Sequence, residues 1–342
     1  MATYKGIKGF KVENVPASPS PLNEGQVWYN TTNNTLDYAT VTGVPAGTWS
    51  SSNPINRGAS EAIGCAQAAP MTTSLIFGGF SAPQYPPGTN AGWTEQYDGT
   101  SWATKNTLPT GRAYVGGLGT NTTAICVGGS AFPTSSTTTA FNFDGTNWTA
   151  GVALAVSFSG GASWGTSTAG VVAGGNPPNG PAGSQIWDGT SWTATGAMSV
   201  GRTESGSSGC GLSTAGIITG GTGPSTAGNV TEFYNGSTWS TASGSITAPV
   251  GLRSGMMFGD QSTAMFVGGY IGPTYSSTNQ IYDGSAWAEG SDIANGRRNS
   301  GRGGGTTSGL IAGGAPSTPP VGTFTEEWSA PSAAVAKTVT VS

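Results

Sequence analysis

The apolar positions of the chain come in short runs that recur at a nearly constant interval. Runs such as Ala124–Val127 and Ala264–Val267 hold about four apolar residues, and each ends at a Gly-Gly pair. A run of this length bounded by glycines is typical of a buried β-strand. The pairs follow one another at intervals of 45 to 50 residues: Gly78-Gly79, Gly128-Gly129, Gly174-Gly175, Gly220-Gly221, Gly268-Gly269 and Gly313-Gly314. This interval is the size of one four-stranded blade of a β-propeller.

A second pattern runs in phase with the first and consists of an aromatic residue, Asp or Asn, Gly, two small residues and Trp. Because Asp-Gly and Asn-Gly reach positive φ at low cost, each copy predicts a tight β-hairpin with an aromatic residue on both arms. The complete copies are Tyr97–Trp102, Phe143–Trp148, Trp187–Trp192, Tyr234–Trp239 and Tyr282–Trp287, and an incomplete copy ends at Trp49.

Each repeat can be divided into four strands, called a to d. Strand a is rich in small residues, as expected where inner strands crowd around a central channel. Strand b is the apolar run, and strands c and d are the arms of the aromatic hairpin, whose rings can fill the space between blades. We therefore predict an all-β protein in which residues 26–342 form one six-bladed β-propeller with almost no helix.

The last repeat has no hairpin after it and therefore lacks strand d. Two segments can supply this strand, the one around Trp49 and the β-branched run Val335–Val341. We favour Trp49, because it stands ahead of Arg57 as the other tryptophans stand ahead of the next repeat. Overlap of the two chain ends would close the ring and remove its edges.

The first 25 residues show no repeat marker. They contain Lys5, Lys8 and Lys11 and a proline-rich run at 16–21. Closely spaced prolines favour an extended chain without ladder hydrogen bonds. Residues 1–25 are thus predicted to form an extended N-terminal arm, which is either a frayed end or a segment that orders against another subunit.

The composition and net charge limit the kinds of partner that the protein can bind. Only 8% of the 342 residues are charged, the net charge is −4, and the 12 basic residues form no dense cluster. We therefore expect no nucleic-acid partner. No segment has the length and apolarity of a signal peptide or a membrane span, so we expect no membrane insertion.

The chain contains no histidine, which removes the commonest general base and metal ligand. The cysteines Cys65, Cys126 and Cys210 are too few and too far apart for a disulfide framework, and we expect them to be reduced core residues. We predict no metal, no cofactor and no enzymatic activity. A glycosidase that uses only carboxylates is the residual alternative.

Gly-Gly after an apolar strand, followed by an aromatic residue and Trp, resembles the kelch repeat over roughly residues 36–342. The hairpin sequence Tyr-Asp-Gly-Thr-Ser-Trp, with Thr94-Glu95 ahead of it, and the N-terminal segment Glu24–Thr32 resemble sequences of the kelch-like virion proteins of tailed phages, marine ones in particular. Kelch domains serve as enzymes, adaptors and adhesins, so the fold alone decides no function.

The resemblance implies a phage structural protein, made in the host cytoplasm and located in the virion. We expect a peripheral propeller on tail or capsid, held to other virion proteins by the N-terminal arm, that can bind host-surface glycan. The alternatives are an intracellular kelch-type adaptor between proteins and, less favoured, a carbohydrate-active enzyme.

The loops between strands b and c vary in length and composition, and variable loops on a rigid ring are common recognition sites. The predicted ligand contacts are aromatic residues of these loops and two arginines that break the repeat symmetry: Tyr85, Phe132, Tyr270, Tyr275, Arg297 and Arg302. Other arginines recur ahead of strand a and are better explained as structural bonds to loop carbonyls: Arg57, Arg112, Arg202, Arg253 and Arg298.

Overall fold

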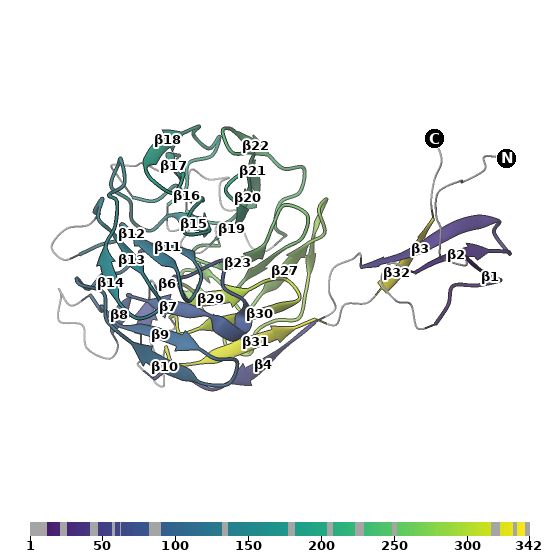
Figure 1. Ribbon diagram of the computed structural model, residues 1–342, viewed down its shortest axis with the longest axis horizontal. Coiled ribbons are helices and arrows are strands. Elements are labelled where there is room, and N and C mark those ends of the chain that lie inside the picture. Colours follow the sequence, from purple (N-terminus) through teal and green to yellow (C-terminus); the bar gives the residue numbers. More distant parts are fainter. Residues whose placement is uncertain are drawn as a thin grey trace. The chain divides into compact units, whose positions relative to one another are not determined.

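The computed structural model describes residues 12–20, 26–41, 47–56, 59–61, 63–81, 90–131, 136–176, 182–203, 208–222, 229–247, 252–315, 322–330 and 334–338. The chain divides into two compact units, Ala46–Ala330 and a terminal unit made of Met1–Pro45 and Pro331–Ser342. Both units are built from β-strands (Figure 1). In the described part of the chain, no helix is long and apolar enough to cross a membrane.

The described residues of Ala46–Ala330 form six four-stranded antiparallel sheets. From innermost strand a to outermost strand d, sheet 1 consists of β6 (Gly64–Cys65), β7 (Leu75–Phe77), β9 (Thr94–Tyr97) and β10 (Trp102–Lys105), and sheet 2 of β11 (Gly116–Gly119), β12 (Ala124–Val127), β13 (Ala140–Phe143) and β14 (Trp148–Ala150). In the same order, sheet 3 consists of β15 (Ala162–Gly165), β16 (Gly170–Ala173), β17 (Ser184–Trp187) and β18 (Trp192–Thr195), and sheet 4 of β19 (Gly209–Leu212), β20 (Ala215–Ile218), β21 (Glu232–Tyr234) and β22 (Trp239–Thr241). Sheet 5 consists of β23 (Met256–Gly259), β24 (Ala264–Val267), β27 (Asn279–Tyr282) and β28 (Trp287–Glu289), and sheet 6 of β29 (Gly301–Gly304), β30 (Ser308–Ala312), β31 (Thr325–Ser329) and β4 (Thr48–Ser52).

The innermost strands contact one another in a closed cycle, from β6 through β11, β15, β19, β23 and β29 back to β6 (Figure 1). This is the arrangement of a β-propeller, as the repeats predict. Short strand pairs lie beside the sheets, β5 (Ala59–Glu61) with β8 (Phe80–Ser81) and β25 (Tyr270–Ile271) with β26 (Thr274–Tyr275).

The core lies along the b strands and between neighbouring sheets. Every residue of β7, β12, β16 and β24 is buried, as predicted for the apolar runs. The three cysteines are buried and reduced, in line with their predicted place in the core.

Tryptophans of the d strands pack against the preceding sheet and donate hydrogen bonds to it. The indole of Trp148 packs against Phe77 of sheet 1 with ring centroids 4.9 Å apart, and its Nε1 donates to Thr94 Oγ1 of that sheet at 2.9 Å. Trp287 donates to Thr231 of sheet 4 in the same way, at 3.0 Å. In four of the six d strands the indole is therefore hydrogen-bonded as well as packed, which fixes its depth and orientation: those of Trp102, Trp148, Trp239 and Trp287.

The strand around Trp49 completes sheet 6, as predicted. β4 pairs with β31 over five residues, with Trp49 opposite Trp328 and their ring centroids 5.5 Å apart. The competing C-terminal strand β32 (Ala334–Thr338) pairs with β3 (Thr35–Val41) in the terminal unit instead.

The predicted domain limits differ from those of the structure. The terminal unit is a four-stranded sheet in the order β1 (Glu13–Val15), β2 (Val27–Asn30), β3 and β32. Residues 26–41 therefore belong to this unit and not to the ring. Glu13–Val15 is a strand parallel to β2, so this part of the predicted extended arm is paired. Residues 1–11 and 21–25 lie outside the described residues.

Candidate functional site

The ring has two ends with different connections. At one, the loop end, the d-to-a connections bond to the residues after strand b, as in Gly79 N–H to Arg112 O at 2.7 Å. At the other, the turn end, each Asp-Gly hairpin turn lies near an a-to-b turn, as Gly99 lies near Thr72 and Gly145 near Thr122. The b-to-c and d-to-a connections therefore share one end of the ring, and the hairpin and a-to-b turns share the other.

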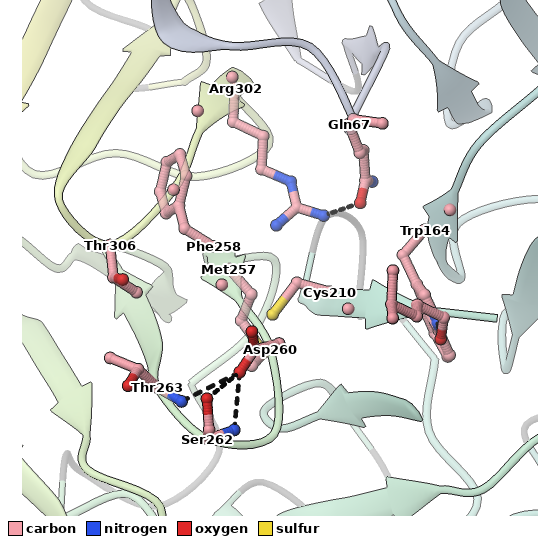
Figure 2. A pocket seen from close by; sticks show the side chains of 18 of the residues that line it. Gln67, Trp164, Cys210, Met257, Phe258, Asp260, Ser262, Thr263, Arg302 and Thr306 are labelled. Atoms are coloured by element: carbon pink, nitrogen blue, oxygen red, sulfur yellow. Dashed lines mark hydrogen bonds between the residues drawn. The ribbon is translucent and has the colours of Figure 1, made fainter. Parts of the chain in front are cut away.

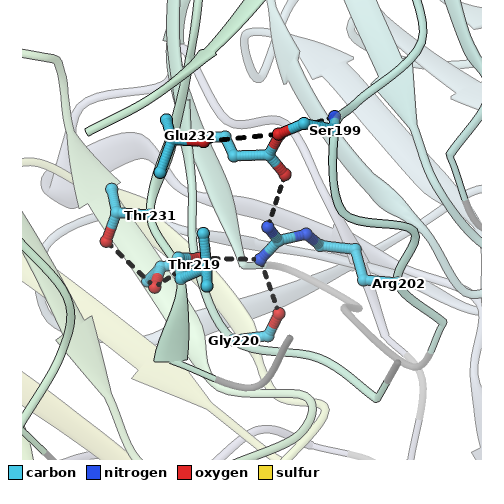
Figure 3. Close-up of polar contacts among 8 residues, drawn as sticks. Ser199, Arg202, Thr219, Gly220, Thr231 and Glu232 are labelled. Atoms are coloured by element: carbon cyan, nitrogen blue, oxygen red, sulfur yellow. Dashed lines mark hydrogen bonds and ion pairs between the residues drawn. The ribbon is translucent and has the colours of Figure 1, made fainter. Parts of the chain in front are cut away.

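Arg202 at the loop end makes a buried structural clamp (Figure 3). Its Nη1 donates to Gly220 O at 2.9 Å and to Val230 O at 3.1 Å, and its Nη2 pairs with Glu232 Oε2 at 2.6 Å. Both side chains have 0% exposure. The other carboxylate oxygen of Glu232 accepts a hydrogen bond from Ser199 N–H at 2.8 Å. The clamp thereby joins strand c to the connection that leads into strand a.

The structure identifies the equivalent positions in the other sheets. The backbone oxygens of Arg112, Phe158, Arg202, Leu252 and Arg297 each accept a hydrogen bond from the second glycine of the preceding Gly-Gly pair. Arg112 then bonds to Gly128 O at 3.0 Å and Arg297 to Phe324 O at 2.9 Å. The structural interpretation is confirmed for Arg112 and Arg202.

The predicted arginine series nevertheless contains a register error. Arg253 and Arg298 stand one residue after the equivalent position, which Leu252 and Arg297 occupy. Arg297 is therefore the clamp residue of sheet 6, 1% exposed and paired with Glu326. It is not placed as an exposed anion contact, contrary to the sequence prediction. Arg57 lies outside the described residues.

Two of the predicted aromatic contacts meet at the loop end. Tyr270 and Tyr275 face each other across the β25–β26 pair with ring centroids 5.1 Å apart, and both are partly exposed. The guanidinium of Arg298 lies 4.3 Å from the Tyr270 ring centroid, within the range of a cation–π contact. Tyr85 and Phe132 lie outside the described residues.

Arg302 lies elsewhere, on the innermost strand β29, beside a central cavity of about 470 Å³ (Figure 2). Turn-end residues such as Thr166, Asp260 and Thr306 line the same cavity. Arg302 therefore does not join the aromatic residues of the b-to-c loops in one site, because strand a carries it to the cavity instead.

The surroundings of Arg302 include residues that the sequence did not single out. Its Nη2 donates to Gln67 Oε1 and to Gly209 O, which belong to sheets 1 and 4. The amide of Gln67 in turn donates to Ser163 Oγ at 3.3 Å. One signal was present in the sequence, since Arg302 is the one charged residue on the six innermost strands.

Comparison with known proteins supports a fold but identifies no family for this chain. The sequence matches no protein-family model and no curated protein. Among solved structures, the chain is similar to one described as the structure of YjhT, with a TM-score of 0.61 and 13% sequence identity. The match covers 80% of this chain and 95% of that chain. A likeness at this identity supports the all-β, propeller-like fold.

Proposed function

We propose that this protein is a structural and adhesive component of a tailed-phage particle, in which a six-bladed kelch-like propeller is displayed and the terminal unit holds it to other virion proteins. The closed cycle of six innermost strands supports this blade number. The assignment to phage particles rests on the resemblance of the hairpin and N-terminal sequences to kelch-like virion proteins.

The observation that carries the proposal is the division of the chain. Both sequence ends leave the ring and pair with each other in a separate sheet, through β3 and β32. A unit that is compact in its own right, with Trp28 fully buried, can attach to a particle without using the ring's own surfaces.

The adhesive part of the proposal assigns host-surface glycan to the loop end. Tyr270 and Tyr275 are rigid aromatic side chains of the kind that stack on sugar rings, and Arg298 braces Tyr270. Each such contact contributes on the order of 1 kcal/mol. Adhesion would therefore depend on many copies acting together on one particle.

Substituting Tyr270 and Tyr275 by Ala should weaken adsorption of particles to cells and leave the melting temperature and the protein's copy number per particle unchanged. Adsorption assays and quantitative mass spectrometry of purified particles measure these quantities. Val152→Ala is the matched control, because Val152 is 48% exposed but follows strand β14 of sheet 2 and lies in neither proposed binding surface. Particles that fail to assemble would identify the loop end as a docking surface instead.

The anchoring part is tested by Trp28→Ala, which empties the centre of the terminal unit. This variant should be missing from particles while its ring unfolds at the same denaturant concentration as wild type. Absence of the wild-type protein from particles would contradict the virion assignment and favour the intracellular adaptor.

A further inference from the structure

We propose that the central cavity at the turn end is a binding site for a small hydroxyl-bearing carboxylate of the uronic-acid type, with Arg302 as its charged contact. The site is distinct from the Tyr270–Tyr275 surface at the loop end. It does not depend on the assignment to phage particles.

The first observation is an incompletely satisfied buried cation. Arg302 is 2% exposed, and its Nε has no hydrogen-bond partner. Its Nη2 is bonded to Gln67 and Gly209, which are neutral, and its side chain also interacts with the Cys65 thiol.

Within the described part of the chain Arg302 forms no ion pair, whereas the buried Arg202 and Arg297 each have a glutamate. The buried Arg112 also lacks a carboxylate, but its Nη1 donates to three oxygens at the loop end and it does not line the central cavity. A buried charge without a counter-charge is costly, and a bound anion would compensate it.

The thiol of Cys210 does not supply this counter-charge. Cys210 lies close enough to interact electrostatically with Arg302, but burial raises the pKa of its thiol to about 12. The thiol is therefore neutral at physiological pH. Burial lowers the pKa of Arg302, as expected for a cation in a site without a counter-charge.

The second observation is the cavity itself. Figure 2 shows the Arg302 guanidinium extending from β29 toward the space bounded by Phe258, Met257 and Cys210. The volume of about 470 Å³ lies in the range of small-molecule sites. Exposed residues at its rim, Leu212 and Thr307 among them, show that it reaches the surface.

The lining indicates what kind of carboxylate fits. Hydroxyl groups surround the cavity, from Thr166, Ser262, Thr263, Thr306 and Thr307, together with the aromatic side chains of Trp164 and Phe258. Hydroxyls and glycine-rich backbone can bond to sugar hydroxyls, and an aromatic wall suits the apolar face of a sugar ring. The guanidinium supplies charge-assisted bonds to the carboxylate.

One acidic residue, Asp260, also lines the cavity. Its Oδ1 accepts hydrogen bonds from Ser262 N–H at 2.7 Å, Ser262 Oγ–H at 2.6 Å and Thr263 N–H at 3.2 Å. These bonds hold the carboxylate toward its own turn, as Figure 2 shows. Its charge nevertheless opposes an anionic ligand, which makes it a second, independent probe of the site.

Isothermal titration calorimetry with sodium glucuronate, and with glucose as its neutral counterpart, tests the proposal on the full chain. Wild type should bind glucuronate saturably and at least about tenfold more tightly than glucose, because charge-assisted bonds are roughly twice as strong as neutral ones. Arg302→Gln should remove that preference. Val152→Ala, at an exposed residue after β14 that does not line the cavity, should leave glucuronate binding unchanged.

Asp260→Asn keeps the test decisive if Arg302→Gln does not fold. Asn235 already accepts the equivalent turn bonds from Ser237 and Thr238 N–H, so the turn can form with Asn. The variant should bind glucuronate severalfold more tightly than wild type and glucose equally well. Equal binding of glucuronate and glucose by wild type, no saturable binding of glucuronate, or unchanged glucuronate affinity in Asp260→Asn would overturn the proposal.

Discussion

At the scale of single residues, four of the hairpin turns depend on one carboxylate each. Asp98 Oδ1 accepts hydrogen bonds from Thr100 N–H at 2.8 Å and Ser101 N–H at 2.7 Å, and Gly99 takes φ +94°. The turn therefore needs positive φ at the glycine alone, while the aspartate closes the loop with its side chain. The same bonds recur at Asp144, Asp188 and Asp283.

These bonds predict a specific acid sensitivity. Each carboxylate accepts a hydrogen bond from the backbone N–H three residues later and another from the N–H two residues later. These bonds hold the pKa of Asp98, Asp144 and Asp283 below the ordinary value of 3.8. A lowered folded-state pKa adds stability above the unfolded value, and this stability is lost as the pH falls through the folded value. Wild type should therefore lose stability progressively below about pH 4.

Replacing the four turn aspartates by Asn should flatten this part of the pH profile and leave stability near pH 7 almost unchanged. Asn keeps both accepted bonds, as Asn235 shows in sheet 4, but does not titrate. Urea unfolding midpoints between neutral and acidic pH measure the effect. Parallel profiles for the two proteins would assign the acid sensitivity to other carboxylates.

At the scale of elements, strand c is joined to the incoming connection by two different residue pairs. Sheets 4 and 6 use Arg with Glu, as in Arg202 and Glu232. Sheet 5 has Leu252 at the arginine position, and Gln280 accepts the bond from Thr247 N–H at 2.8 Å. Both pairs satisfy the connection's backbone N–H, so the ion pair is one of two solutions to the same packing problem.

We expect the Arg–Glu pair of sheet 4 to be replaceable by the Leu–Gln pair of sheet 5 only when both residues are changed together. Glu232→Gln alone leaves Arg202 buried without a carboxylate and should cost about 3–5 kcal/mol in the free energy of unfolding. Adding Arg202→Leu should recover most of this loss, because the double variant recreates the pair of sheet 5. Urea unfolding of both single variants and the double variant measures the coupling. Additive losses would show that the site cannot repack around Leu.

At the scale of the whole molecule, the ring is closed by hydrogen bonds and side-chain packing between segments far apart in sequence. β4 supplies the outer strand of sheet 6, and Trp102 Nε1 of sheet 1 donates to Thr325 Oγ1 of sheet 6 at 3.0 Å. Closure leaves each innermost strand with a neighbour on both sides. Loss of the closing strand should therefore weaken all sheets together.

Gly47→Ala tests this closure with a single added carbon. A Cβ at Gly47 would lie 2.3 Å from Cζ2 of the buried Trp328, so the indole or β4 must move. We expect a loss of about 1–3 kcal/mol, as for other overpacked sites, expressed as a shift of one cooperative transition.

Gly305→Ala is the matched control, because nothing lies within 4 Å of its added Cβ. This variant should unfold like wild type. A Gly47→Ala variant with an unchanged midpoint would show that β4 can detach without weakening the ring.

Local chemistry determined the features that the sequence predicted correctly. The Gly-Gly pairs, the aromatic hairpins and the buried runs each follow from residues that are neighbours in the chain, so their strands could be placed without knowing the fold. Trp49 was identified as the closing strand because the repeats share one phase, and one repeat lacked its fourth strand.

Tertiary structure decided the features that depend on where distant segments meet. The connections before strand a differ in length, so only the backbone bonds showed that Arg297, and not Arg298, matches Arg202. The β-branched C-terminal strand can pair with any open edge, and β3 of the terminal unit offered one. Arg302 became a buried cation beside a cavity because six inner strands converge on one axis, which brings residues of sheets 1, 4 and 6 together.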